Sequence, residues 1–164
     1  MSQFVSLLDH VARDQVECLN EDEGHRVANL FGNDSSSYLA SDIDPQLIIS
    51  IPFRAPAKLS GLKFTFGDDV EAIPSCVKVF INRVSLGFGD AESLTPLQII
   101  SREELLSNES VTLRYVLFQN VHSLQLFVED NGGAEKTKIG KIDILGTLGE
   151  TMNMKDFKKI KDDE

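Results

Sequence analysis

The stretch that most constrains the fold is Val111–Asp130, VTLRYVLFQNVHSLQLFVED. Apolar and polar residues alternate through it, and a β-strand turns successive side chains to opposite faces. The alternation predicts two strands joined by a tight connection near Asn120–His122, in a sheet with one face in the core and one in water. The residues expected to share a face are Arg114, Val116 and Phe118 in the first strand and Leu124, Leu126 and Val128 in the second. On this pairing Phe118 and Leu126 are buried partners across the hairpin, and Tyr115 and Phe127 lie off the core face.

Further short β-strands are predicted along the chain from the same alternation. Pro52 lies inside the first of them, so that strand should end there or lie at a sheet edge. The predicted strands are Leu47–Phe53, Lys58–Phe66, Cys76–Asn82, Leu97–Ile100 and Thr137–Leu145.

Helical and loop signals are fewer. Gln3–Arg13 carries apolar residues at helical spacing and is predicted to be a short amphipathic helix. Ser101 and Glu104 form a capping box ahead of a helical turn at Glu103–Leu106. The polar segment Asp14–Asp44 is expected to form long loops over the sheet edge, with a short strand at Tyr38–Leu39. Gly87–Asp90 and Asn131–Gly133 are expected to be turns.

Short strands without βα alternation indicate an all-β fold. The predicted connections are uneven, tight at the central hairpin and long between Asn82 and Val111. Uneven connections favour strands that cross between two sheets. The expected architecture is therefore an antiparallel β-sandwich of the jelly-roll type, with a short N-terminal helix.

Composition limits the partners. The 164 residues suffice for one domain with its own core, and the formal net charge is −10. Nucleic acid and anionic membranes both need basic surface, so neither is expected as a partner, and the acidic surface favours a monomer. The N-terminus lacks the basic and apolar pattern of a secretory signal. Two cysteines outside any CxxC pair fit reduced thiols, which indicates the cytoplasm, with the nucleus as the other open compartment.

Several segments resemble successive motifs of the PITH domain family. The strongest resemblance lies in Leu113–Val116 followed by Phe118–Val121, with Ser123–Leu124 and Phe127–Glu129 behind it. The other matching segments are Glu17–Asn20, Ser41–Asp44 with Gln46–Leu47, Val77–Asn82, Asn153–Met154 and Phe157–Lys158. Two positions depart from the family pattern, namely Pro45, where an acidic residue is usual, and Gly140–Lys141, where the pattern is more aromatic.

The resemblance implies a jelly-roll domain, similar to galactose-binding domains, that associates with the 26S proteasome without catalysis and without a cofactor. The family occurs C-terminal to a thioredoxin domain in thioredoxin-like proteins and also as a free-standing domain. Any thioredoxin domain of the natural protein would precede Met1. We expect residues 1–151 to form the sandwich and residues 152–164 to form a polar, lysine-rich tail.

Catalytic and metal chemistry are not indicated by the side chains. Cys18 follows Glu17, which disfavours a thiolate, so structural cysteines are expected at Cys18 and Cys76. No zinc spacing links the histidines, which are expected at the surface; they are His10, His25 and His122. The acidic segments Glu21–Glu23 and Asp42–Asp44 lack the ligand spacing of a calcium loop and are expected to be solvated. The glycine turns at Gly132–Gly133 and at Gly87 and Gly89 are expected to lack a following helix, so phosphate binding is not expected there.

Two interpretations of function differ in class. The first is a protein-interaction domain, and its expected partner-binding residues lie in the tail: Lys155, Phe157, Lys158 and Lys159. An aromatic anchor flanked by charges suits a small docking segment. The alternative is a carbohydrate- or small-ligand-binding jelly roll. Sugar sites use exposed aromatic platforms, and with no Trp in the chain Tyr38 and Phe88 are the only loop candidates.

Overall fold

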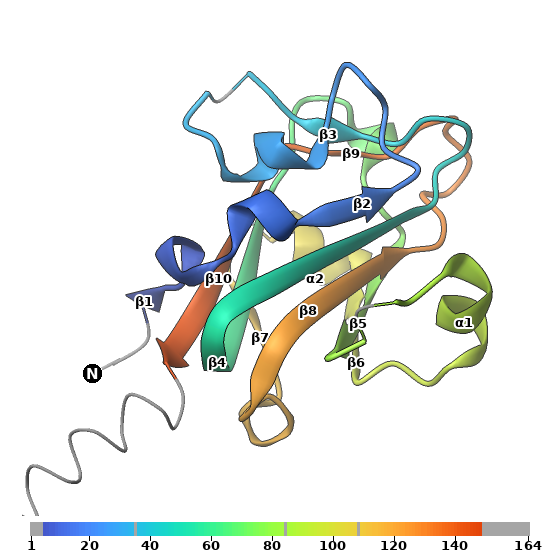
Figure 1. Cartoon of the computed structure of the whole chain (residues 1–164). Coiled ribbons are helices and arrows are strands. Elements are labelled where there is room, and N and C mark those ends of the chain that lie inside the picture. The colour runs from blue at the N-terminus through green and yellow to red at the C-terminus, as the bar shows by residue number, and fades with distance from the viewer. Residues whose placement is uncertain (1–4, 35, 84, 108, 149–164) are drawn as a thin grey trace, which may run out of the picture.

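A single 19-residue strand, β4 (Leu47–Thr65), organises the fold. The computed structural model describes residues 5–34, 36–83, 85–107 and 109–148. In it β4 bends near its middle and contributes one half to each layer of an antiparallel sandwich (Figure 1). The sandwich predicted from the sequence is therefore confirmed.

The first half of β4 pairs with β2 (Glu17–Leu19) on one side and with β8 (Val121–Val128) on the other. Beyond β8 this layer continues through β5 (Cys76–Ile81) to β6 (Gln98–Ser101). Both of the latter strands agree with the sequence prediction. The layer therefore has β2 and β6 at its two edges.

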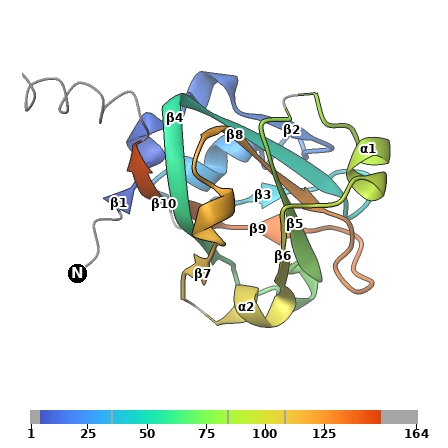
Figure 2. The same ribbon diagram turned by 90° about the horizontal axis from the view of Figure 1, so that it is seen from below.

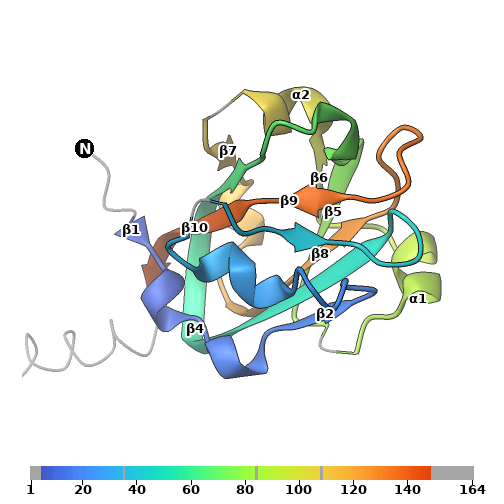
Figure 3. The same ribbon diagram turned by 90° about the horizontal axis from the view of Figure 1, so that it is seen from above.

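The second half of β4 forms the other layer. It pairs with β10 (Lys141–Leu148) on one side and with β7 (Val111–Thr112) on the other, and β10 pairs in turn with β1 (Val5–Ser6). A separate two-stranded sheet joins β3 (Leu39–Ala40) to β9 (Lys138–Ile139), and Figure 3 shows the pair lying across the top of the sandwich.

Within the described ranges the helical segments are short. The α-helices are α1 (Phe88–Ser93) and α2 (Arg102–Leu106), and the 3-10 turns are η1 (Leu8–His10), η2 (Arg13–Gln15), η3 (Val27–Phe31), η4 (Val70–Ala72) and η5 (Tyr115–Leu117). The predicted capping box is present: the Glu104 N–H donates to Ser101 Oγ, and the Ser101 N–H donates to Glu104 Oε1 at 3.0 Å.

The core lies between the two layers and is built by the strand alternation. In β4, Leu47, Ile49 and Ile51 face inward and are no more than 1% exposed. A second, smaller cluster lies on the outer face of the first layer, where α1 and the loop before it cover Phe80 and Phe127. Because of this cover, β8 is buried on both faces rather than on the one that the sequence predicts.

The predicted central hairpin is wrong in its first strand. Only Val111 and Thr112 are extended there; they pair with β4 rather than β8, and η5 follows. Backbone bonds to β4 hold the segment away from β8 and replace the hairpin ladder. Phe118 and Leu126 are both buried, as predicted, in one core cluster, but they are not cross-strand partners.

The predicted N-terminal helix is also wrong over the described part of Gln3–Arg13, which forms β1 and η1. Its apolar residues are instead fixed by the sheet: the Leu7 N–H donates to the Ile144 carbonyl at 2.7 Å, and Val11 bridges to Phe53. Leu7 and Val11 are each 1% exposed. Contacts with the sandwich thus override a weak local helix pattern.

Three smaller predictions differ from the structure. The predicted strands Leu47–Phe53 and Lys58–Phe66 belong to one strand, and Pro52 lies inside the layer, where the pairing register with β8 shifts before Ala57. Where the register shifts, the ladder of backbone hydrogen bonds is interrupted, so the layer does not require a bond from the N–H that proline lacks. The strand predicted at Thr137–Leu145 is divided at Gly140, and the turn predicted at Gly87–Asp90 is the start of α1.

Candidate binding site

Asn20, at the end of β2, joins two of the segments that resemble family motifs. Its side-chain amide donates to the carbonyls of Asp44 and Gln46 at 3.1 and 2.8 Å, and its Oδ1 accepts the Ile43 N–H at 3.2 Å. The residue has a φ of 70°, a conformation that asparagine tolerates better than most side chains. The motif thus holds the 42–46 loop against the sheet.

Asn82, at the end of β5, has the same role at the opposite end of the layer. Its φ is 60°, and its Oδ1 accepts the N–H groups of His122 and Ser123 at 2.7 and 3.2 Å. Its Nδ2 donates to the Asn120 carbonyl at 3.1 Å. Asn82 therefore fixes the start of β8. These two asparagines give the matching segments a structural explanation that involves no chemistry on a substrate.

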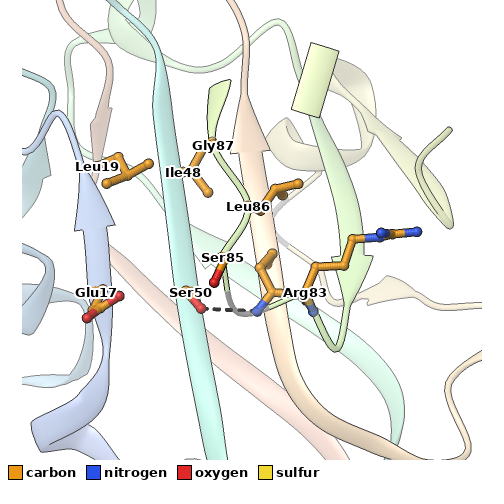
Figure 4. Close-up of a pocket in the computed structure, with 9 residues that line it drawn as sticks. Glu17, Leu19, Ile48, Ser50, Arg83, Ser85, Leu86 and Gly87 are labelled. Carbon is orange, nitrogen blue, oxygen red and sulfur yellow. Dashed lines mark hydrogen bonds between the residues drawn. The ribbon is translucent and has the colours of Figure 1, made fainter. Parts of the chain in front are cut away.

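A groove runs over the outer face of the first layer, between β2 and the loop after β5 (Figure 4). Its volume is about 330 Å³. Leu19, Ile48 and Leu86 supply its apolar surface, and Glu17 lies at one end. Leu19 is 42% exposed, so the groove offers an apolar contact at the sheet edge. The Arg83 side chain extends away from the other labelled residues in Figure 4.

A buried amide forms the polar part of this groove. Gln125 is fully buried, and its Nε2 donates to the hydroxyls of Ser50 and Ser123 at 3.0 and 2.9 Å. Its Oε1 accepts the Arg83 N–H at 3.0 Å. Every polar atom of this amide has a partner, so it orders the groove without needing a ligand.

The groove combines apolar side chains with a few polar groups. The described residues that line it include no histidine, cysteine or lysine, and the Ser50 hydroxyl accepts a hydrogen bond from the buried Gln125 amide. The sequence interpretation missed this groove because its residues come from β2, β4, β8 and the loop before α1. One signal in the sequence could have indicated it. Phe127 lies off the predicted core face, and an apolar side chain on that outer face needs covering residues, which Leu86 and Phe88 provide.

The two cysteines are free thiols in unreactive surroundings. Cys18 packs against the main core, and this burial, reinforced by the nearby Glu21 carboxylate, raises the pKa of its thiol far above the ordinary range. Burial also raises the pKa of the Cys76 thiol. A thiol held protonated is a poor nucleophile, so the geometry favours the structural interpretation of both residues.

The candidate sugar platforms are engaged in contacts within the fold. The Tyr38 ring stacks on His25 with 4.1 Å between centroids, and Lys138 Nζ lies 5.5 Å from the same ring. The Phe88 ring packs against Phe127 with centroids 6.2 Å apart. Neither ring stands free as a flat platform of the kind that sugars stack on.

The acidic segments carry protein contacts of their own. Glu21 Oε1 accepts the Val27 N–H at 2.8 Å, Asp44 Oδ1 accepts the Gln46 N–H at 3.0 Å, and Asp22 lies 3.7 Å from Lys136 Nζ. Within residues 5–34, 36–83, 85–107 and 109–148, no three His, Cys, Asp or Glu side chains gather as a metal site would require. In the same ranges no helix has the length and apolar character to cross a membrane.

The predicted tail residues cannot be placed. Lys155, Phe157, Lys158 and Lys159 lie outside the residues that the structure describes. At Pro45, one of the two positions that depart from the family pattern, the backbone carbonyl accepts a hydrogen bond from Thr137 Oγ1 at 2.7 Å. At Gly140 a Cβ would meet the Thr65 carbonyl oxygen at 2.7 Å, so glycine permits this close approach of the two strands.

Solved structures place this architecture among the jelly-roll sandwiches. The family 32 carbohydrate-binding module of Clostridium perfringens NanJ, solved with galactose, superposes with a TM-score of 0.64 at 11% identity, covering 87% of this chain and 98% of the module. CBM32-3 from a family 31 glycoside hydrolase of the same organism superposes with a TM-score of 0.58 at 11% identity, and the match covers 85% of this chain and 96% of that module. At such identities the likeness shows the fold alone.

Sequence comparison gives the family. The PITH domain model matches residues 1–162, and the chain belongs to the PITH domain family. It is 36% identical over 151 residues to Thioredoxin-like protein 1 of Schizosaccharomyces pombe, covering 87% of this chain and 51% of that protein, about half its length. PITH domain-containing protein 1 of Homo sapiens is 30% identical over 143 residues, covering 84% of this chain and 67% of that protein.

Proposed function

We propose that this chain is a non-catalytic protein-interaction domain that associates with the 26S proteasome. The observation that carries the proposal is membership of the PITH family across residues 1–162, together with the proteasome association that the motif resemblance implies. The two asparagine contacts and the unreactive thiols support it, because the matching segments are used to hold loops and strands in place rather than to form a reaction centre.

We also propose that the tail contributes to docking. Lys155, Phe157, Lys158 and Lys159 combine an aromatic anchor with positive charge, and charges of this kind mainly accelerate the encounter with an acidic surface. The proposal requires that the chain be present in the cytoplasm or the nucleus. It also has the chain act as a monomer. A thioredoxin domain preceding Met1 in the natural protein would supply any redox activity.

Carbohydrate binding is the competing function, and it is suggested by fold neighbours alone. The NanJ module is solved with galactose. The engaged rings of Tyr38 and Phe88 weigh against it, because a sugar would have to displace their existing contacts.

The test is retention on purified 26S proteasomes. The full chain is incubated with intact proteasomes and analysed by native gel and immobilised pull-down. The NanJ carbohydrate-binding module serves as control, because it shares the fold without the family. We expect the chain to migrate with the proteasome and the control to remain free. A chain that stays free would overturn the proposal. Saturable hits on a glycan array that vanish in Phe88→Ala would establish the rival function.

A further inference from the structure

The turn η5 displays apolar side chains instead of burying them. Leu113 and Phe118, at its two ends, are 2% and 0% exposed. Between them Val116 is 81% exposed and Leu117 40%, and Arg114 is exposed as well. We call Arg114, Val116 and Leu117 the η5 tip. It is the gold turn between β7 and β8 at the bottom of Figure 1, and it faces the viewer in Figure 2.

This exposure does not result from a loosely held loop. The Leu113 N–H donates to the Ser60 carbonyl and the Leu59 N–H donates to the Phe118 carbonyl, each at 2.9 Å, so β4 holds both ends. Gln119 Nε2 donates to the Tyr115 carbonyl at 2.6 Å across the turn. The fold therefore holds Val116 and Leu117 in water in a fixed conformation. A preorganised apolar projection loses little conformational entropy when a partner covers it.

A groove of about 500 Å³ lies beside the tip. Leu113, Tyr115 and Leu145 provide its larger side chains, and Ser60, Gly61, Ser110 and Thr112 complete it. The groove joins η5 to β10 across the second half of β4. The tip and groove together offer both a projection and a recess, which is the shape that a protein partner can match closely.

Charge indicates the character of the partner. The chain has a net charge of −10, yet the tip carries Arg114, whose guanidinium has no ion-pair partner among the described residues. Arg54 and His122 are exposed at the same end, where Pro52 pairs with Ser123 and Ala57 with Val121. The two arginines, Arg54 and Arg114, are exposed beside apolar side chains on an otherwise acidic protein, and such a surface complements an acidic one.

The end of the described chain lies at this same end of the sandwich. Leu148, the last residue of β10, pairs with Ala57, while Leu59 bonds to the Phe118 carbonyl. Leu148 therefore lies close to the segment that carries the η5 tip.

We propose that the η5 tip and its neighbouring groove form the surface by which this chain docks on its protein partner, which presents an apolar pocket bordered by carboxylates. The inference rests on the proposed proteasome association and adds to it the docking surface and the chemistry of the acceptor. Val116 and Leu117 enter the pocket, and Arg114 pairs with the carboxylates at its rim.

The test compares charge and polarity changes at the tip with matched changes at the far end. Val116→Asp and Arg114→Glu alter the tip. Ile43→Asp and Arg26→Glu are the controls, because Ile43 is 86% exposed and Arg26 is exposed. Ile43 lies in the loop held by Asn20 and Arg26 precedes η3, at the opposite end of the sandwich from η5 (Figure 1). Dissociation constants for purified 26S proteasomes are measured over a range of salt concentrations, and a thermal midpoint is recorded for each variant.

Both tip variants should weaken binding about tenfold or more, which is the scale of an interface hot spot. Arg114→Glu should also reduce the salt dependence, whereas both controls should bind like the wild type. Thermal midpoints should stay unchanged, because the altered side chains lie in water. Tip variants that bind like the wild type would overturn the docking surface and leave the proteasome association standing. A wild-type chain that fails to bind at low salt would overturn both.

Discussion

Substitution of Asn82 tests whether the asparagine contacts are what hold the first layer in register. Asn82 combines two separable properties, a positive φ of 60° and three side-chain hydrogen bonds to backbone groups at the start of β8. Asn82→Gly keeps access to the backbone conformation and loses the hydrogen bonds. Asn82→Ala loses both. Asn82→Asp keeps an acceptor for the two N–H groups and loses only the amide donor.

The magnitudes follow from these contacts. A net hydrogen bond contributes about 0.5–1.5 kcal/mol, and Asn82 is exposed, so water replaces part of each bond. We expect Asn82→Gly to lower the free energy of unfolding by about 2 kcal/mol on that scale. Asn82→Ala should cost about 1–2 kcal/mol more, because an L side chain is disfavoured at positive φ. Asn82→Asp should cost about 1 kcal/mol.

Urea denaturation followed by far-UV circular dichroism provides the measurement, with a constant m-value showing that the folded and unfolded states remain comparable. The urea midpoint should be highest for the wild type and then fall in the order Asn82→Asp, Asn82→Gly, Asn82→Ala. Equal loss in the Gly and Ala variants would refute the role of the backbone conformation. A midpoint unchanged in Asn82→Ala would refute the structural role altogether.

Three further outcomes are expected. Phe118→Ala should lower the free energy of unfolding by about 3–5 kcal/mol, because the ring is fully buried. The control Val116→Ala should change the free energy of unfolding by no more than about 0.5 kcal/mol, because that side chain is exposed. Equal denaturation midpoints for the two variants would contradict this. Because burial raises the pKa of Cys18 in the folded state, the unfolded thiol ionises first as pH rises above about 8.5. Stability present at neutral pH is then lost, so wild type should weaken relative to Cys18→Ala between pH 8 and 10, by at most about 1.4 kcal/mol per pH unit in urea titrations; parallel curves would contradict the shift. Removing the residues after Asn153, or replacing the four tail lysines by Gln, should weaken proteasome binding with thermal stability nearly unchanged, and full binding by the truncated chain would place the interface wholly on the sandwich.

The elements that depend only on neighbouring residues could be predicted from the sequence. The capping box at Ser101 and Glu104 and the strands β5 and β6 follow from short patterns, and all are present. β8 was also recognisable, but its burial on both faces was not, because the cover for Phe127 comes from a loop that is distant in sequence.

The remaining errors have a common cause in long-range backbone bonds. Residues 111–118 alternate like a strand, yet β4 takes up their backbone groups and leaves Val116 in water. The segment 5–13 has helical spacing, yet β10 and Pro52 take up its N–H groups at Leu7 and Ala12. Neither competitor can be recognised within a window of neighbouring residues. The candidate binding surfaces were missed for the same reason, because each draws its side chains from several elements.

The shared strand β4 has a consequence for synthesis on the ribosome. Its residues 57–65 find their partners in β10, at residues 141–148, near the far end of the chain. Until those residues leave the exit tunnel, half of β4 lacks a neighbour along one edge, and the layer it belongs to cannot close. Contacts between such distant residues also slow folding, because a large loop must close first. We therefore expect the nascent chain to remain protease-sensitive until Leu148 has emerged, and to acquire protection in both layers in a single late step.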